Sequence, residues 1–511
     1  MVSTRRWIDG LSVIGAFCLC ESVAGAAPEL PIDDTTYQDL YRLQDQGDVP
    51  VWAVSGNRVQ TESVIRSLFA TSKTEPHLHL VDTELKGLWV RPAERLTTRL
   101  SLASDTARPY SVPARPRNML GELELACEYQ EGRPCGDGAR GLLELDSSAG
   151  YGRWLSAFSR IQAQATGTDR VSAGATVDRL YASLELGPAE LLVGRNTVLV
   201  GPGRHTQLLW SASPAPIDQL QLSIRGLAVP MLAIRVGGTY VLGRLDSPQR
   251  FTNTLVSLAR VYVELADRVN LGMTNLLILG GRGAPSVGLW QFVEEHVHRT
   301  GPWPSEGVSD RRLGLDMTVG VPSLRSTFYT ELVFEDSRAQ LANALAHDVD
   351  YLLGWAASGL GRSKNHGFLI ELVRTGVRSE EHGVFSSGMT SGARVLGSPL
   401  GPDATSLYVS PRWDIRQDHL SIAPWCEWVR TGSDTFVFPE NAGISRATSG
   451  LAEFRTRAGL DAIARIEPDL WLRTGAFFEH VDNEAFQVAT RNNAGLSLSV
   501  VWQNNGTAGI R

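Results

Sequence analysis

A tight turn followed by polar and aromatic residues stands in the stretch VLVGPGRHTQLLWSASPAP, residues 198–216. Gly201-Pro202-Gly203 has the look of a phosphate-binding loop, but such a loop needs a lysine and a hydroxyl residue directly after its last glycine, at the start of a helix. Arg204 and His205 stand there instead, and the following IDQLQLSIRG alternates with period two. The turn therefore predicts a loop between strands, whose glycines and prolines set the backbone shape.

Metal and catalytic motifs are weak. His296 and His298 form a His-x-His pair, as do His77 and His79, but no Cys, Asp or third His stands at a recognisable ligand spacing. The sequence GMTSG, residues 388–392, has Thr390 where a nucleophile elbow needs serine, and there is no H-E-x-x-H motif. We therefore expect no metal, no cofactor and no enzymatic activity.

The composition bounds the class of protein. The chain has 511 residues and a formal charge of −7, which argues against nucleic acid as a partner. Arg5 and Arg6, the apolar LSVIGAFCLC and the small residues 24–26 form the layout of a cleaved signal peptide over residues 1–26. No later run approaches the ~18 apolar residues of a membrane helix, so membrane insertion would require a β-barrel.

Three cysteines would remain after cleavage. Cys127 and Cys135, in CEYQEGRPC, are close enough to form a disulfide in an oxidising compartment, whereas Cys426 has no obvious partner.

Residues 27–117 are expected to form a small helical unit. In PIDDTTYQDLYRLQDQGDVP, Tyr37, Leu40, Tyr41 and Gln44 follow helical spacing after a cap at Asp34 or Thr35. Residues 61–69, TESVIRSLF, suggest a second helix.

From residue 118 the hydrophobic period becomes two. In EFRTRAGLDAIARI, Phe454 and Leu460 lie on an apolar face, and Arg455 and Arg457 lie on the opposite, charged face. The segments RLGLDMTVGV, LWLRTGAFFEH and AGLSLSVVWQ alternate in the same way. Alternation is common to soluble sandwiches and membrane barrels, so it does not separate them.

The lengths of the connections do separate them. Short connections are expected at 187–188, 226–230, 266–268, 321–325, 359–365, 415–418 and 466–468, and long ones at 196–216, 245–257, 281–309, 337–349, 377–404 and 431–450. Short turns on one side and long loops on the other are typical of an outer-membrane barrel with periplasmic turns and extracellular loops. The pattern predicts a transmembrane antiparallel β-barrel of about 18 strands over residues 118–503, preceded by the α-helical periplasmic unit and followed by a tail at 504–511.

Four further segments follow one another along the chain: PIDDTTYQDLYRLQDQGDVP, GRNTVLVGPGRHTQLLWSASPAP, FYTELVFED (Phe328 to Asp336) and VLGSPLGPDATSLYVSPRW, whose loop carries Gly397, Pro399, Gly401, Pro402 and Asp403. Together, and in this order, they resemble the Wzi-type capsule assembly family of outer-membrane proteins. The resemblance implies a non-enzymatic outer-membrane protein that binds surface polysaccharide and helps to organise capsule or exopolysaccharide. Its expected partners are that polysaccharide, outer-membrane lipid and the barrel-assembly machinery. The alternative is a porin-like channel for small or anionic solutes.

A lectin-like surface should offer flat apolar faces beside hydrogen-bond donors. The long loop at 281–309 provides both kinds of group, and the loop at 198–216 adds two further candidates. The expected carbohydrate contacts are Trp290, Phe292, Trp303, His296, His298, Arg299, Arg204 and Trp210. The other interpretation is that the aromatic residues form the loop's own small core.

Charged residues on the inward face have two interpretations as well. They either steer an anionic polymer or pair with opposite charges across the lumen and seal it, and we favour the pairing. These residues are Arg160, Arg225, Arg235, Arg260, Glu331, Glu335, Arg455, Arg457 and Arg473.

Overall fold

The computed structural model describes most of the chain beyond residue 34. The described ranges are 35–51, 87–104, 138–152, 154–167, 171–229, 232–297, 308–335, 349–382, 384–392, 394–416, 419–432, 435–437, 445–447, 450–504 and 508–509. The expected signal peptide, the expected helix at 61–69, and Cys127 and Cys135 lie outside these ranges.

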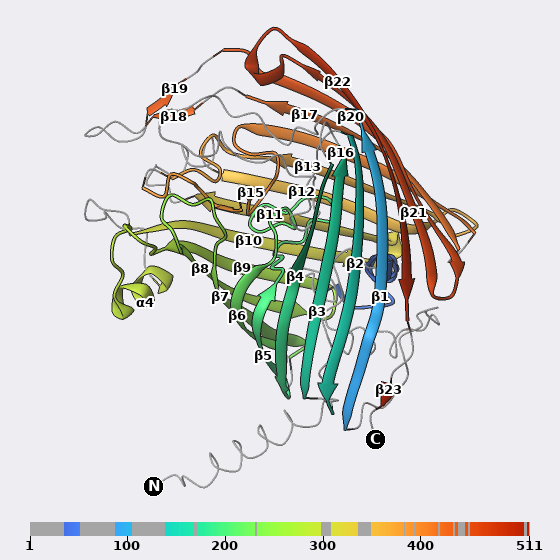
Figure 1. Cartoon of the computed structure of the whole chain (residues 1–511), viewed down its shortest axis with the longest axis horizontal. Coiled ribbons are helices and arrows are strands. Elements are labelled where there is room, and N and C mark those ends of the chain that lie inside the picture. Colours follow the sequence, from blue (N-terminus) through green and yellow to red (C-terminus); the bar gives the residue numbers. More distant parts are fainter. Residues whose placement is uncertain are drawn as a thin grey trace.

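A closed ring of 18 antiparallel strands forms the body of the molecule (Figure 1), because the first and last strands pair with each other. The ring consists of β1 (Leu88–Ala103), β2 (Gly138–Tyr151), β3 (Leu155–Gly167), β4 (Val171–Leu186), β5 (Ala189–Asn196), β6 (Ile217–Val229), β7 (Ile234–Arg244), β8 (Leu255–Leu265), β9 (Val269–Leu279), β10 (Ser309–Val321), β11 (Ser326–Glu335), β12 (Val349–Leu360), β13 (His366–Arg374), β16 (Ala404–Arg416), β17 (Leu420–Thr431), β20 (Glu453–Glu467), β21 (Leu470–Asp482) and β22 (Thr490–Gln503). The predicted barrel is confirmed.

Smaller elements lie in the connections and at the end of the chain. They are the hairpins β14 (Thr390–Ser391) with β15 (Arg394–Val395) and β18 (Thr435–Val437) with β19 (Ser445–Ala447), the 3-10 turns η3 (Pro322–Leu324) and η4 (Glu484–Phe486), and the two-residue β23 (Ala508–Gly509). β23 pairs with the start of β1.

The two faces of the wall follow the predicted alternation. On β20, Phe454 is 48% exposed on the outer face, whereas Arg455 is only 4% exposed on the inner face. A closed antiparallel sheet satisfies its own backbone hydrogen bonds, and an apolar outer surface is what contact with acyl chains requires.

The two openings of the barrel differ. We call the opening with short connections, such as 187–188 and 266–268, the turn end. The opposite opening, the loop end, carries the long connections at 197–216, 245–254 and 375–403. This alternation of short and long connections agrees with the sequence prediction.

The barrel begins earlier than expected. β1 starts at Leu88, inside the range 27–117 that was expected to be helical. Its register with β2 shifts between Arg91 and Arg95, around Pro92, so the alternation that reveals the other strands is interrupted here.

Helix α2 (Thr35–Gln46) forms where the sequence predicts a helix. It lies at the turn end, where the adjacent Gly47 meets Pro322 and Gln46 approaches Gly359. Tyr37 and Leu40 on its apolar face are buried. Figure 1 shows this helix in dark blue behind β1. The helix therefore stands beside the short turns that follow β10 and β12.

Candidate functional site

The loop between β5 and β6, residues 197–216, folds into the barrel. Its residues Val198, Leu208 and Trp210 are buried in one apolar cluster with inner-wall residues such as Val256 and Leu276. The loop is therefore a plug inside the lumen, which we call the β5–β6 plug.

The two glycines of the opening turn permit this path. Gly201 has φ +123°, and a Cβ there would lie 2.8 Å from a carboxylate oxygen of Glu331. A Cβ at Gly203 would lie 1.6 Å from the carbonyl oxygen of Thr206. Neither position has room for a side chain, so the glycines are needed for the shape of the plug.

Two carboxylates of the inner wall hold the backbone of the plug. Glu371 on β13 accepts hydrogen bonds from the N–H groups of Arg204, His205 and Thr206 at 2.6, 3.0 and 2.9 Å. Glu331 on β11 accepts from Leu208 at 3.0 Å and from Leu209 at 3.2 Å. Five donors that a loop would otherwise leave unpaired are thus satisfied inside the barrel.

The Arg204 side chain joins the plug to helix α2. Its guanidinium donates to both carboxylate oxygens of Asp45 at 3.0 and 2.5 Å and lies 4.4 Å from the ring centre of Tyr41. The Ser358 hydroxyl also donates to Asp45, at 2.7 Å. Burial opposes the charge of Arg204, but the attraction of Asp45 outweighs it and raises the pKa above its ordinary value. A loop that starts at one opening is therefore bonded to a helix at the other.

The next residue along the plug contacts another part of the wall. The His205 ring stacks on Tyr408 with centroids 3.7 Å apart and planes 10° apart, and its Nε2 lies 3.6 Å from Glu427. Arg457 pairs with the same Glu427 at 3.2 Å and lies 5.6 Å from the ring of Trp425. His205 thus completes a cluster of rings and charges on β16, β17 and β20.

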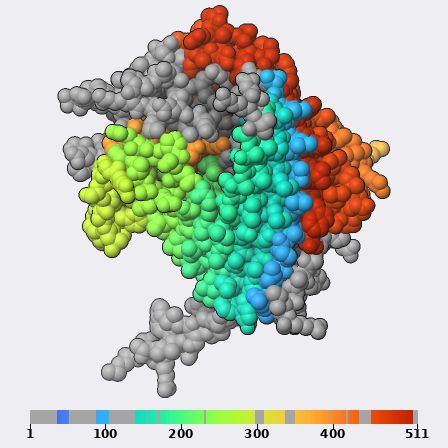
Figure 2. Space-filling model, viewed as in Figure 1, coloured from blue at the N-terminus to red at the C-terminus, as the bar shows by residue number. Residues whose placement is uncertain are grey.

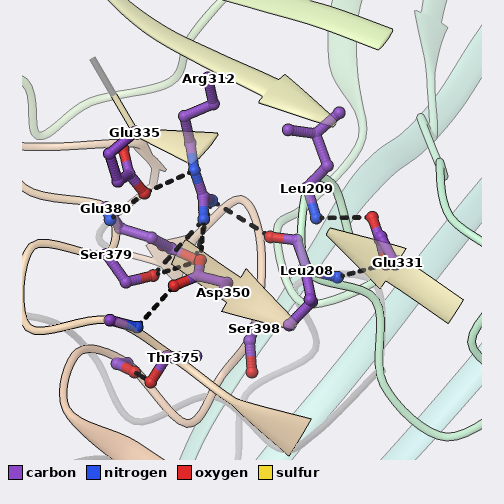
Figure 3. Close-up of polar contacts among 12 residues, drawn as sticks. Leu208, Leu209, Arg312, Glu331, Glu335, Asp350, Thr375, Ser379, Glu380 and Ser398 are labelled. Atoms are coloured by element: carbon purple, nitrogen blue, oxygen red, sulfur yellow. Dashed lines mark hydrogen bonds and ion pairs between the residues drawn. The ribbon is translucent and has the colours of Figure 1, made fainter. Parts of the chain in front are cut away.

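A second loop, residues 375–403 between β13 and β16, is held around Arg312 (Figure 3). Arg312 on β10 is ion-paired with Asp350, with Glu335 at 2.8 Å and with Glu380 at 3.4 Å. Its Nη1 also donates to the carbonyl of Leu208 in the plug, at 3.1 Å. One buried guanidinium therefore connects the wall to both loops.

Glu380 is the member of this cluster that comes from the loop. Burial raises its pKa well above the ordinary value, although Arg312 opposes the shift. A carboxyl group with a raised pKa keeps its proton more readily, which limits the negative charge that collects around Arg312.

Long loops interlock at the loop end. The Ser211 N–H of the plug donates to the carbonyl of Leu396 at 2.6 Å. Asp246, in the loop between β7 and β8, donates its N–H to Ser391 at 3.0 Å, and its carbonyl accepts from Gly392 at 3.1 Å. Hydrogen bonds therefore join three of the long connections to one another at the loop end.

The inward charges form ion pairs, as the sequence analysis favoured. Arg160 pairs with Asp146 on the neighbouring strand at 2.7 Å. Arg260 on β8 reaches Asp316 on β10 at 2.6 Å, over Gly272, where a Cβ would lie 2.2 Å from the guanidinium. Four other predicted inward residues form ion pairs: Arg225 with Glu185 and Glu190, Arg455 with Glu453 and Glu479, Arg457 with Glu427 and Glu479, and Glu335 with Arg312. Glu331 accepts hydrogen bonds from the backbone of the plug. In the strand register, Arg235 lies opposite Glu264 and Arg473 lies opposite Ser499.

The residues expected to contact carbohydrate do not lie together. Trp210 is 1% exposed inside the plug, and Arg204 is bonded to Asp45. Trp290, Phe292 and His296 belong to helix α4 (Leu289–Val297) in the connection between β9 and β10. Two separate places in the fold therefore hold the described candidates.

Within α4, the three candidates differ in their surroundings. Phe292 contacts His296 with ring centres 4.5 Å apart, and the His296 Nε2 is 2.7 Å from the Ser257 hydroxyl. Trp290 is 73% exposed. His298, Arg299 and Trp303 lie outside the described residues, and their assignment stays a prediction.

Sequence reasoning missed several of the residues that fix the β5–β6 plug and the loop at 375–403, namely Asp45, Arg312, Asp350, Glu371 and Glu380. Glu371 could have been found from the alternation in FLIELVR, which places it on the same face of β13 as the buried Val373. Its function as an acceptor for three loop N–H groups has no signal in sequence spacing, because the loop and the strand are far apart in the chain.

Neither α2 nor α4 has the length and apolar character needed to span a membrane. Within the described ranges, no group of three or more His, Cys, Asp or Glu side chains is arranged to hold a metal ion. Cys426 is a free thiol.

Comparison with known proteins gives one family and several solved structures. A model of the capsule assembly protein Wzi family matches residues 122–493. Among solved structures, the fold is similar to that of Wzi from Escherichia coli, an outer membrane protein involved in group 1 capsule assembly and described as a carbohydrate-binding β-barrel. The two sequences are 15% identical, the match covers 94% of this chain and 100% of that chain, and the TM-score is 0.67.

Two further solved structures match more weakly. OccK5 (OpdH) from Pseudomonas aeruginosa has 13% identity, coverage of 84% and 100%, and a TM-score of 0.44. A BenF-like porin from Pseudomonas fluorescens Pf-5 has 10% identity, coverage of 82% and 98%, and a TM-score of 0.46. No curated protein sequence matches the chain.

Proposed function

This chain belongs to the capsule assembly protein Wzi family, and from that premise we propose that it is a non-enzymatic outer-membrane protein that binds surface polysaccharide and helps to assemble or organise it at the cell surface. The loop end then faces outwards, and the turn end with α2 faces the periplasm, in keeping with the usual arrangement of long loops and short turns.

The observation that carries the proposal is that long loops are bonded to the inner wall and to one another. Glu331 and Glu371 hold the β5–β6 plug, and Arg312 holds the loop at 375–403. Asp246, in the loop between β7 and β8, is bonded to the loop at 375–403. Loops that are fixed inside and across the lumen favour a protein that binds a ligand outside the barrel over one that passes solutes through it.

The binding would consist of many weak contacts. A polysaccharide repeats its units, so several copies of the protein hold one chain even when the affinity of each site is modest. The family relationship supports this reading, since Escherichia coli Wzi is described as a carbohydrate-binding barrel. We assign the sugar contacts to the connection between β9 and β10, with His298, Arg299 and Trp303 as the residues to test.

The test is retention of the detergent-purified protein on immobilised surface polysaccharide from the producing organism. We expect retention that soluble polysaccharide of the same kind competes away. The combined change of His298, Arg299 and Trp303 to Ala should reduce it at least tenfold.

Trp210→Phe is the matched control, because it changes an aromatic residue that is buried in the plug. Retention of every variant at the wild-type level would remove the site, and no retention of the wild type would remove the proposed function.

A further inference from the structure

Helix α4 lies on the outside of the barrel. Val256 and Leu258 on β8 belong to the core inside the lumen, so Ser257 between them points outwards. The same alternation on β9 places Leu276 inside and Leu277 outside. Because Ser257 is bonded to His296, α4 covers the outer surface of these strands rather than the mouth of the barrel.

Polar groups fix α4 to this outer surface. The buried carboxylate of Glu295 accepts hydrogen bonds from Ser309 at 2.5 Å and from Arg311 at 2.9 Å. The Asn275 amide donates to the carbonyl of His296 at 3.2 Å. The barrel thus places polar side chains on its outer face near the loop end, and α4 pairs with them.

A different side of α4 is apolar and uncovered. Leu289, Trp290 and Val293 are 84%, 73% and 43% exposed. Their spacing of one, three and four residues gathers them on one side of the helix. Gln291 and Glu294 lie on another side. The part of α4 that faces away from the barrel therefore has an apolar side and a polar side.

The exposed side continues the apolar surface of the wall. Leu277 is buried where α4 lies, and Met273 on the same face of β9 is 51% exposed. Four residues along a strand span about 13 Å. Val261 and Leu315, which pair with Met273, are exposed as well. Figure 2 shows the segment around α4 in yellow-green as a lobe beside the wall.

We propose that α4 is an interfacial helix that inserts Leu289, Trp290 and Val293 among the acyl chains of the membrane leaflet at the loop end. Lipid is the occupant that fits, because the exposed apolar residues of the outer wall beside α4, such as Met273, form the surface that an outer-membrane barrel turns to acyl chains. Amphipathic helices with a tryptophan bind at this depth of a bilayer. The helix extends the contact between barrel and lipid and fixes the start of the long loop at the membrane surface.

The test is quenching of tryptophan fluorescence in vesicles of phosphatidylcholine brominated on its acyl chains. The contribution of Trp290 is the difference between the wild type and Trp290→Phe. The matched reference is Trp428→Phe, since Trp428 is an exposed residue on the outer face of β17. We expect brominated lipid to quench the Trp290 and Trp428 contributions by at least half, and aqueous iodide to quench neither.

A Trp290 contribution that iodide quenches and brominated lipid does not would overturn the proposal. Protection of Trp290 from both quenchers, together with a particle mass that falls in Trp290→Phe, would also overturn it, in favour of contact with a second copy of the chain. As a second variant, Leu289→Ser with Val293→Ser should keep the heat-modifiable barrel and shift the Trp290 emission to the red. An unchanged emission in that variant would count against insertion.

Discussion

At the scale of single residues, the bond between Arg204 and Asp45 is a contact whose loss should destabilise the barrel strongly. Asp45 is fully buried, so Arg204→Ala leaves a carboxylate inside the barrel with Ser358 as its remaining partner. Breaking a buried ion pair on one side typically costs about 3–5 kcal/mol. We expect Arg204→Ala to lower the urea concentration at the midpoint of unfolding. Unfolding is measured as the loss of heat-modifiability on gels.

Arg244→Ala is the control for this change. Arg244 also pairs with an aspartate, Asp218, but its side chain is 52% exposed. Exposed pairs contribute about 0–1 kcal/mol. Equal shifts of the midpoint in the two variants would show that the buried ion pair between plug and helix stabilises the barrel no more than an exposed pair does.

Glu380 should give the stability of the barrel a dependence on pH. Its pKa is raised well above the ordinary value of 4.5, chiefly by burial. The folded protein therefore holds this proton more tightly than the unfolded chain does. The stabilisation is fully present below pH 4.5 and is lost as the pH rises through the raised pKa.

We expect Glu380→Gln to flatten the fall of the melting temperature above pH 4.5, because glutamine keeps the shape of the side chain and does not titrate. Glu294→Gln, at an exposed position on α4, is the control. The measurement is the melting temperature from pH 4.5 upwards. An equal fall in the wild type and in Glu380→Gln would contradict the assignment of the pH dependence to Glu380.

At the scale of elements, the β5–β6 plug depends on a glycine. Gly203→Ala places a Cβ 1.6 Å from the Thr206 carbonyl, so the backbone that donates to Glu371 has to move. Overpacking of this kind costs about 1–3 kcal/mol. We expect faster tryptic cleavage after Arg204, since the loop leaves the lumen more often.

Gly288→Ala is the matched loop control for Gly203→Ala, because an added Cβ there meets nothing within 4 Å. Cleavage after Arg204 at the same rate in both variants would mean that the plug tolerates the change.

The elements also show how far sequence reasoning reaches. Alternation reveals β20 because each residue of a strand responds to only two surroundings, lipid and lumen. It missed β1, where Pro92 and a register shift interrupt the pattern. The direction in which a loop folds is not periodic at all. The loop at 197–216 lies inside the barrel and α4 lies outside it because of partners such as Glu371 and Ser257, which are distant in the chain.

At the scale of the whole molecule, the two openings are connected through the interior. The plug begins at the loop end, is held midway by Glu331 and Glu371, and meets α2 at the turn end through Arg204. Removal of the plug therefore takes away the material that fills part of the lumen and one of the contacts that hold α2 beside the opposite opening.

We accordingly expect the intact barrel to show little conductance in planar bilayers, whereas replacement of residues 198–214 by a short Gly-Ser linker should give stable current steps. The control is removal of residues 289–297, the segment of α4, because that helix lies against the outer wall at Ser257 and should leave the conductance unchanged. Current through the intact barrel would favour a channel instead of a closed binding protein. A barrel that stays silent without its plug would show that the loop at 375–403, held by Arg312, is sufficient to close it.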